Sequence, residues 1–213
     1  MFCFVSFGDF DLMSYDLILA DPPWRYDFAA TNSRKIENQY PTMSVDAISA
    51  LQVPARANCV LYLWATAPKL REALAVMYAW DFEYKTHGIW MKDRLGMGYW
   101  WRNQHELLLV GVRGKVSPPV PSLRTSSLMQ GIHAEHSKKP ESVYEMIERQ
   151  HREKTKVELF ARNIRDGWAH WGNELPNTAM MSCGHHADTI THDTLAPFCS
   201  ECHNVETMIE GET

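Results

Sequence analysis

Residues 15–24 read YDLILADPPW, a short apolar run that ends in an aspartate, two prolines and a tryptophan. An apolar run of this length, closed by prolines, predicts a buried β-strand that leads into a loop at its carboxyl end. The two prolines have fixed φ angles and lack backbone N–H groups. We therefore expect free carbonyl acceptors beside the Asp21 carboxylate at the tip of this strand.

Apolar runs alternate with helical patterns over the rest of the chain. Strands are predicted at 59–65, 82–92, 105–114 and 156–161, with a last short one within 167–174. Helices are predicted from Ser44 to Leu51, from Pro68 to Trp80 and from Pro140 onward, with long loops at 25–43 and 115–139. This alternation favours an α/β fold in which helices cover both faces of a mainly parallel sheet.

The ends of the predicted strands are the first places to look for functional residues, because ligands of such sheets bind outside the carboxyl ends of the strands. Three apolar runs lead directly into Asp21, Lys92 and Ala161. The stretches that begin at these residues are therefore expected to form the site.

The composition is 45% hydrophobic and 22% charged over 213 residues, which is typical of a soluble globular protein. We expect one main domain, 1–176, and a separate tail, 177–213, where Ser, Thr, His, Asp and Cys become frequent. No apolar run approaches the roughly 20 residues of a membrane span. The absence of a basic leader and the odd count of five cysteines favour a cytoplasmic protein without a membrane partner. The net charge of -5 gives no overall attraction to nucleic acid.

The DPPW segment is one of a series of segments that occur in the order of a known family. The others are QYPTMS (39–44), LYLW (61–64), GIWMK (88–92), HELLLVGVRG (105–114), HSKKPESVYEMIE (136–148), KVELFAR (156–162) and GWAHWGNE (167–174). Over about residues 15–174 the chain resembles the DPPW-type (MT-A70-like) N6-adenine methyltransferases, in particular bacterial and phage members. The resemblance implies a Rossmann-like methyltransferase fold with a circularly permuted motif order, because the catalytic motif comes first. It also implies the cofactor S-adenosylmethionine and a nucleic-acid substrate.

The resemblance also implies roles for individual residues. The catalytic motif corresponds to Asp21, Pro22, Pro23 and Trp24. Cofactor contacts are expected from Asp21, Pro22, Lys92, Glu158, Phe160, Arg162, Asn173 and Glu174. Contacts to the nucleic acid are expected from Trp24, Arg25, Tyr40, Lys138 and Lys139. Lys92 falls where the family contacts the carboxylate side of the cofactor, and Asn173 where it holds the ribose hydroxyls.

The expected chemistry of the DPPW segment concerns an adenine amino group, which is a poor nucleophile because its lone pair is delocalised into the ring. The Asp21 carboxylate and the Pro22 carbonyl are expected to accept its two N–H groups. These acceptors would stabilise the charge that develops on nitrogen in the transition state. The Trp24 indole is expected to supply a stacking face for a base drawn out of its strand, although a core position is the alternative.

Two other segments have open interpretations. HSKKP at 136–140 begins a predicted helix, where backbone N–H groups and two lysines could hold a phosphate, or where the chain is simply a solvated helix entrance. Tyr99, Trp100, Trp101 and Arg102 combine aromatic rings with a cation in one loop, as single-stranded nucleic-acid surfaces do, or else they close the core.

The tail contains two pairs of metal-ligand residue types. They are Cys183 with His185 or His186, and Cys199 with Cys202. This spacing suits a tetrahedral zinc site, which would stabilise a segment too short to build a hydrophobic core. A structural zinc is one interpretation and a loosely packed tail is the other, and the family resemblance does not extend here.

The leading hypothesis is an enzyme that methylates adenine, with DNA favoured over RNA because the compact chain resembles bacterial and phage members. One alternative is a catalytically inactive homologue that binds nucleic acid, against which the intact Asp21 argues. Another is methylation of a protein amide or amine, a chemistry that usually pairs with Asn at the first motif position.

Overall fold

Residues Tyr15–Ala20 form strand β1 in the middle of the main sheet, as their apolar character predicts. Strands β2 (Ala55–Thr66) and β6 (Lys156–Leu159) flank β1, and both run parallel to it. A strand with parallel neighbours on both sides is covered on both faces. Every residue of β1 except Asp16 is accordingly buried.

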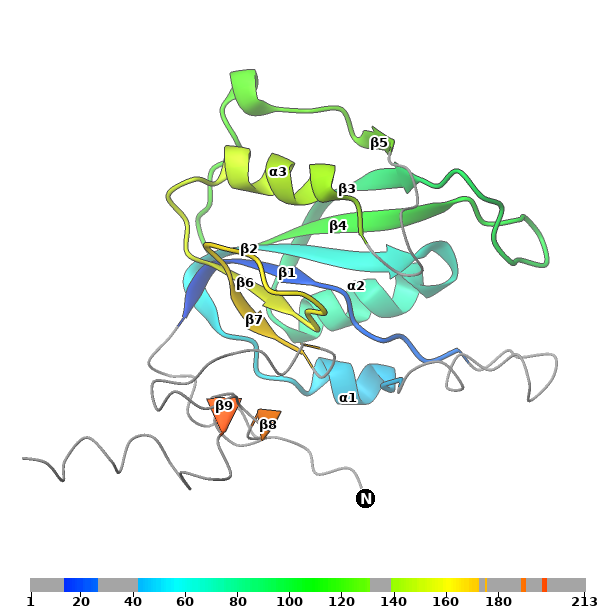
Figure 1. Ribbon diagram of the computed structural model, residues 1–213, viewed down its shortest axis with the longest axis horizontal. Helices are drawn as coiled ribbons and strands as arrows, with labels where there is room; N and C mark the ends of the chain where they lie inside the picture. The colour runs from blue at the N-terminus through cyan, green and yellow to red at the C-terminus, as the bar shows by residue number, and fades with distance from the viewer. Residues whose placement is uncertain are drawn as a thin grey trace, which may run out of the picture.

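The structure, a computed structural model, describes residues 14–26, 42–130, 139–172, 175, 189–190 and 197–198. Its main sheet has the strand order β5-β3-β4-β2-β1-β6-β7 (Figure 1). The other strands of this sheet are β3 (Glu83–Met91), β4 (His105–Arg113), β5 (Leu128–Gln130) and β7 (Ala169–Trp171). β4 runs against both of its neighbours, and the other neighbouring pairs are parallel. The predicted α/β, Rossmann-like fold with a mainly parallel sheet is confirmed.

Helices cover both faces of this sheet (Figure 1). Helix α3 (Glu141–Gln150) lies on one face, and α1 (Val45–Ser49) and α2 (Leu70–Ala79) lie on the other. Successive side chains of a strand point to opposite faces. Leu17 and Leu19 of β1 therefore join the hydrophobic cluster that includes α3, whereas Ile18 and Ala20 join the cluster that includes α1 and α2.

Local signals fixed the starts of the helices. Ser44 is the N-cap of α1, and its Oγ accepts the backbone N–H of Ala47 at 3.1 Å, as its side chain suits it to do. This helix ends at Ser49, two residues before the predicted end. Pro68 lies in the 3-10 turn η4 (Ala67–Lys69), which leads directly into α2.

Two elements differ from the sequence prediction because distant segments create them. β2 begins at Ala55 rather than at residue 59, since Ala55 pairs with Tyr15 and Arg56 bonds the Asp16 carboxylate at 2.9 Å. β5 and the 3-10 turn η5 (Pro121–Leu123) lie within the stretch predicted as a loop. Three residues are too few for a periodic pattern, and β5 is defined by its pairing with β3.

In the tail, β8 (Thr189–Ile190) pairs antiparallel with β9 (Pro197–Phe198). The candidate zinc ligands Cys183, His185, His186, Cys199 and Cys202 lie outside the described residues. The zinc site and the division of the chain at residue 176 therefore stay predictions. Within the described ranges, no helix combines the length and apolar character that crossing a membrane requires.

The topology brings the predicted functional segments to one edge of the sheet. β1, β2, β3 and β6 end there, and the antiparallel β4 begins there, so that Glu106 of β4 pairs with Thr66 at the end of β2. The stretches that follow Ala20, Met91 and Leu159 are therefore neighbours in space, as the sequence predicted.

Candidate active site

The Asp21–Trp24 segment leaves the tip of β1 and is held by backbone hydrogen bonds. The Pro22 carbonyl accepts the N–H of Trp24 at 2.8 Å, and the Pro23 carbonyl accepts the N–H of Met43 at 2.8 Å. The expectation of free carbonyls is therefore corrected, because each has one partner. A carbonyl oxygen has two lone pairs, so each retains capacity for a second donor.

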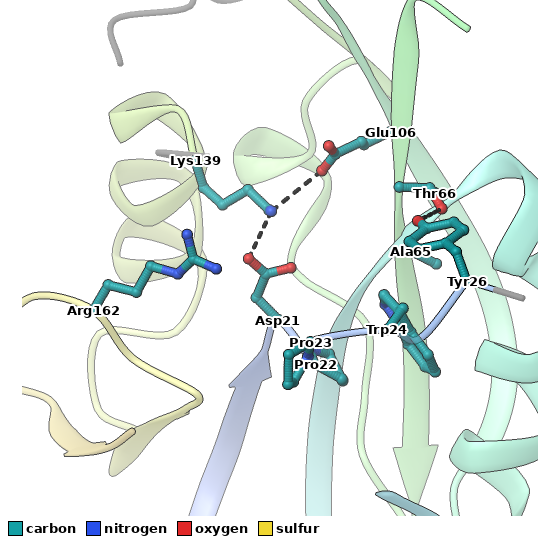
Figure 2. A pocket seen from close by; sticks show the side chains of 10 residues that line it. All are labelled: Asp21, Pro22, Pro23, Trp24, Tyr26, Ala65, Thr66, Glu106, Lys139 and Arg162. Atoms are coloured by element: carbon teal, nitrogen blue, oxygen red, sulfur yellow. Dashed lines mark hydrogen bonds and ion pairs between the residues drawn. The ribbon is translucent and has the colours of Figure 1, made fainter. Parts of the chain in front are cut away.

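A pocket opens beside this segment (Figure 2). It is lined by Asp21, Pro22, Pro23, Trp24, Tyr26, Ala65, Thr66, Glu106, Lys139 and Arg162. The wall therefore combines the loop after β1 with the end of β2, the start of β4, the entrance of α3 and the loop after β6. These are the elements that meet at the functional edge of the sheet.

Lys139 joins two carboxylates at the pocket wall. Its Nζ lies 2.6 Å from Oδ2 of Asp21 and 3.2 Å from Oε2 of Glu106 (Figure 2). Lys92, at the end of β3, donates to Oε1 of Glu106 from the other side. We call these four residues, Asp21, Lys139, Glu106 and Lys92, the charge network. Its alternating signs fix the Asp21 carboxylate in place.

Burial strengthens this network. The side chains of Lys139 and Glu106 are only 10% and 12% exposed. Burial alone would raise the pKa of Glu106, but the ammonium groups of Lys139 and Lys92 outweigh it and hold that pKa below its ordinary value. Burial alone would likewise lower the pKa of Lys139, but the carboxylates of Asp21 and Glu106 raise it. The pairings within the network therefore outweigh burial and favour the charged forms of Glu106 and Lys139.

Two tryptophans support the two lysines. The Nζ of Lys139 lies 5.3 Å from the ring centroid of Trp64, and the Nζ of Lys92 lies 5.0 Å from that of Trp90. The two indoles pack edge to face with centroids 6.0 Å apart. Cations over indole faces gain from the ring quadrupole, and more so where water is excluded. The buried rings therefore help to set the positions of both ammonium groups.

Trp24 and Tyr26 form the wall opposite Lys139. Trp24 is 4% exposed, and its Nε1 donates to the Trp64 carbonyl at 3.1 Å. The hydroxyl of Tyr26 lies 2.5 Å from Oγ1 of Thr66. The Trp24 indole is thus anchored in the core while it borders the pocket, and its role as a stacking face stays a prediction.

A second buried carboxylate lies near the end of β6. Glu158 accepts a hydrogen bond from the Tyr144 hydroxyl of α3 at 2.8 Å. Burial raises the pKa of Glu158 to about 7, and the Tyr144 hydrogen bond offsets only part of that effect. Glu158 therefore changes its charge close to neutral pH.

The turn that follows β6 is unusually tight. Phe160 has a positive φ of 63°, which is uncommon for a bulky residue, and its ring packs against Trp171 with centroids 5.1 Å apart. A Cβ at Gly172 would lie 2.0 Å from the carbonyl oxygen of Ala161, so only glycine fits there. This geometry holds the loop after β6 against the end of β7 and sends Arg162 toward the pocket.

The structure gathers most of the predicted site residues and separates a few. The pocket wall includes Asp21, Pro22, Pro23, Trp24, Lys139 and Arg162. Lys92 belongs to the charge network behind Glu106, and Arg25 is exposed. Lys139 differs from both sequence interpretations of HSKKP, because its ammonium is buried between carboxylates instead of solvated at a helix entrance. Tyr40, Lys138, Asn173 and Glu174 lie outside the described residues.

Sequence reasoning missed four residues of the pocket wall: Tyr26, Ala65, Thr66 and Glu106. Glu106 had a usable signal, since it is an acidic residue at the start of the apolar run that ends at Arg113. In a sheet with one antiparallel strand, the start of that strand lies at the same edge as the ends of its neighbours. Tyr26, Ala65 and Thr66 gave no comparable signal.

Comparisons with known proteins identify the family of the chain. The MT-A70 family matches residues 15–174. The chain is 32% identical over 183 residues to the Type II methyltransferase M.MunI of a Mycoplasma species, covering 76% of this chain and 78% of that protein. It is 28% identical over 191 residues to the human N(6)-adenosine-methyltransferase catalytic subunit METTL3, covering 84% of this chain and 31% of that protein. The chain is also 31% identical over 184 residues to a putative N(6)-adenosine-methyltransferase MT-A70-like protein of Medicago truncatula. This match covers 81% of this chain and 28% of that protein.

Proposed function

The chain belongs to the MT-A70 family, and from this we propose that it transfers a methyl group from S-adenosylmethionine to the N6 amino group of adenine in a nucleic acid. The observation that carries the proposal is the Asp21 carboxylate at the tip of β1. One of its oxygens is fixed by Lys139, and the other points away from Lys139 into the pocket (Figure 2). Pro22 lies on the same short segment and lines the same pocket.

The charges around the pocket fit the proposed cofactor. S-adenosylmethionine contains a sulfonium and an ammonium, which need acceptors, and a carboxylate, which needs a cation. Asp21 and Glu106 are the acidic residues of the wall, and Lys139 and Arg162 are its basic ones. Lys139 is better placed than Lys92 to meet a carboxylate, because Lys139 lines the pocket and Lys92 contacts it only through Glu106.

The second carboxylate fits the adenosine half of the cofactor. Glu158 is a buried acceptor at the end of β6, held by one hydroxyl donor from Tyr144. Ribose hydroxyls are donors of the same kind. Glu158 and Phe160 would therefore hold the nucleoside part, in line with the roles that the family resemblance implies.

When bound, S-adenosylmethionine supplies an electrophilic methyl group on a positively charged sulfur. The residues of this chain prepare the amine that accepts it. Oδ1 of Asp21 and the second lone pair of the Pro22 carbonyl accept the two N–H groups of the adenine amine, which aims the nitrogen lone pair away from the protein. These fixed acceptors stabilise the transition state, in which charge develops on nitrogen, because they need no reorganisation during the reaction.

The charge network keeps Asp21 ready for this role. Nitrogen gains a methyl group and sheds one proton, and Oδ1 of Asp21 is the acceptor in contact with that proton. Lys139 contacts Oδ2 of Asp21 at 2.6 Å and holds the carboxylate in place. Glu106 in turn holds Lys139 in position from its other side. The network therefore positions a carboxylate with one free acceptor face.

DNA is favoured over RNA as the substrate. The chain spans 78% of the length of the mycoplasma Type II methyltransferase but only 31% of the human N(6)-adenosine enzyme subunit. Most of the compact bacterial relative therefore matches this chain, whereas only a part of the animal protein does. The intact Asp21 and charge network favour an active enzyme over an inactive binding homologue.

Methyl transfer to separate substrate pools tests this proposal. The purified chain is incubated with methyl-labelled S-adenosylmethionine and, separately, with DNA, RNA or protein. Asp21→Ala is assayed in parallel with Asp46→Ala, a matched control in the exposed first turn of α1. We expect label in DNA, recovered as N6-methyladenine after digestion, about 100-fold less label with Asp21→Ala, and no change with Asp46→Ala.

Two results would reject the enzyme. One is the absence of label from all three pools, and the other is equal labelling by the wild type and Asp21→Ala. Label that enters RNA in preference to DNA would correct the substrate class and leave the chemistry intact.

A further inference from the structure

The connection between β3 and β4, residues 93–104, presents three consecutive aromatic side chains to solvent. We call it the aromatic loop. Tyr99, Trp100 and Trp101 are 84%, 95% and 83% exposed. Of the ten large hydrophobic side chains that are exposed in the described part of the chain, five belong to this loop, including Leu95 and Met97. These aromatics therefore do not close the core, and an exposed apolar group of this size marks a binding surface.

The aromatic loop is held in a defined shape. The N–H of Gly96 donates to the Asn103 carbonyl at 2.7 Å, and Nε of Arg102 donates to the Gly96 carbonyl at 2.7 Å. A Cβ at Gly98 would lie 1.9 Å from the carbonyl oxygen of Trp101, so the bend that displays the aromatics requires glycine. A surface fixed before binding loses less conformational freedom when a ligand arrives.

The aromatic loop starts and ends at the candidate active site. Lys92 immediately precedes it and Glu106 follows it closely, and these two residues form an ion pair within the charge network. Figure 1 shows the connection projecting beyond the edge of the sheet at which β1 and β2 end. A ligand that reaches from the pocket past this edge therefore meets the aromatic loop next.

The charge of this stretch indicates the kind of ligand. The aromatic loop contains the cations Arg94 and Arg102 and the single anion Asp93, although the whole chain has a net charge of -5. Aromatic rings beside cations suit nucleic acid, whose bases stack and whose phosphates are negative. A second copy of the chain is disfavoured, because a two-fold contact between two aromatic loops would bring like charges together.

We propose, on the basis of the proposed function, that the aromatic loop stacks on unpaired bases next to the target adenine. The rings of Trp100 and Trp101 hold the flanking nucleotides outside the pocket while the target base enters it. Every base has a π-face, so this contact tolerates different flanking sequences. The preferred substrate is therefore single-stranded or locally unpaired near the adenine.

Binding of a labelled single-stranded DNA oligonucleotide with one adenine tests the proposal, with fluorescence anisotropy at fixed salt as the readout. The full chain is compared with the double variant Trp100→Ala/Trp101→Ala. Tyr78→Ala is the matched control, because Tyr78 of α2 is an aromatic residue that is 62% exposed outside the loop. We expect Kd to rise about 5- to 150-fold for each stacked base lost, and to stay within about twofold for the control.

An abasic site beside the adenine makes the test specific for stacking. Removal of the flanking base should weaken binding by the wild type and have little further effect on the double variant, because both changes delete the same contact. Additive effects of the two changes would overturn the proposal. So would an unchanged Kd for the double variant, or loss of a dimer without loss of DNA affinity.

These outcomes separate the aromatic loop from the proposed function. If the wild type methylates DNA and the double variant binds and methylates equally well, the inference about the loop fails and the function stands. If the wild type methylates no nucleic acid but its oligonucleotide binding depends on Trp100 and Trp101, the function fails and base stacking stands.

Discussion

Glu106 and Glu158 are buried carboxylates at the same edge of the sheet, but their surroundings shift their pKa values in opposite directions. Glu106 lies between Lys139 and Lys92, which hold its pKa below the ordinary value against the effect of burial. Glu158 has the Tyr144 hydroxyl as its hydrogen-bond donor, and burial raises its pKa to about 7. Two carboxylates shielded from solvent thus differ in charge: Glu106 at the start of β4 stays charged, and Glu158 at the end of β6 titrates.

This difference suggests that the two carboxylates have different roles. The charge network holds the Asp21 carboxylate in position before any ligand binds, which suits a group that acts on the reacting amine. Glu158 is an acceptor whose charge is only weakly supported, which suits contact with neutral hydroxyl donors of a nucleoside. Breaking either set of contacts should therefore have distinct consequences.

The largest effect is expected from Lys139→Met, which removes the central cation of the charge network and keeps the side-chain stem over Trp64. Asp21 and Glu106 would then lose the ammonium that lies between them, and Glu106 would keep its pair with Lys92. Breaking a buried ion pair in this way costs about 3 kcal/mol of unfolding free energy. Urea unfolding at pH 7 measures it, and Lys85→Met, which breaks the exposed pair with Glu83, should cost less than about 1 kcal/mol. Equal stability of the two variants would show that the network does not stabilise the fold.

The next effect concerns pH and has opposite signs at the two carboxylates. The pKa of Glu158 is raised from 4.5 to about 7 on folding. Its protonated form therefore stabilises the protein fully below pH 4.5, and this contribution is lost as the pH rises through about 7. The free energy of unfolding of Glu158→Gln, taken relative to that of the wild type, should therefore rise by about 3 kcal/mol between pH 4.5 and pH 8.

Glu106→Gln is the matched variant for this measurement. The pKa of Glu106 is lowered on folding, so its contribution is present above its ordinary pKa and is lost as the pH falls. Relative to the wild type, Glu106→Gln should therefore lose stability as the pH rises. Urea midpoints at pH 4.5 and pH 8 give the Glu158→Gln difference, and midpoints at pH 4.5 and at a pH well below it give the Glu106→Gln difference, because the contribution of Glu106 is lost only below its ordinary pKa. A change of the same sign in both variants would contradict the comparison.

A smaller effect is expected from Tyr144→Phe, which removes the hydroxyl that donates to Glu158. The loss should cost about 1 kcal/mol and move the pKa of Glu158 further up, because the hydrogen bond lowers it. Tyr62→Phe, which removes a buried hydroxyl that bonds His151 at 2.9 Å, should cost a similar amount without changing the Glu158 titration. The pH dependence of the free energy of unfolding distinguishes the two variants. Identical profiles would show that the Tyr144 hydroxyl does not influence the pKa of Glu158.

The sequence predicted the parts of the molecule that local patterns determine. The apolar run before Asp21 predicted β1 and the position of Asp21 at its tip, and Ser44 predicted the start of α1. The rule that ligands bind at the carboxyl ends of strands located the site. The family resemblance named six of the ten residues of the pocket wall before the geometry was known.

The contacts that sequence patterns did not predict join residues far apart in the chain. Asp21 and Lys139 are 118 positions apart, and no periodicity links them. The role of Glu106 depends on β4 running against its neighbours, which a run of apolar residues does not reveal. The exposure of Trp100 and Trp101 depends on a bend at Gly98. Glycine is required there because the Trp101 carbonyl approaches its Cα closely, a contact that only the folded loop shows. Charge pairing and exposure are thus tertiary properties, whereas strand ends are local ones.

The most direct test of the central claim is the single-turnover rate of methyl transfer by Asp21→Asn, with S-adenosylmethionine and an adenine-containing oligonucleotide both saturating. This variant keeps the shape of the side chain and removes its charge, and single-turnover conditions separate the chemical step from binding. We predict a rate about 100- to 1000-fold below that of the wild type, with the Kd for the cofactor changed by less than about fivefold. A rate within a few-fold of the wild type would contradict the claim that the Asp21 carboxylate prepares the adenine amine.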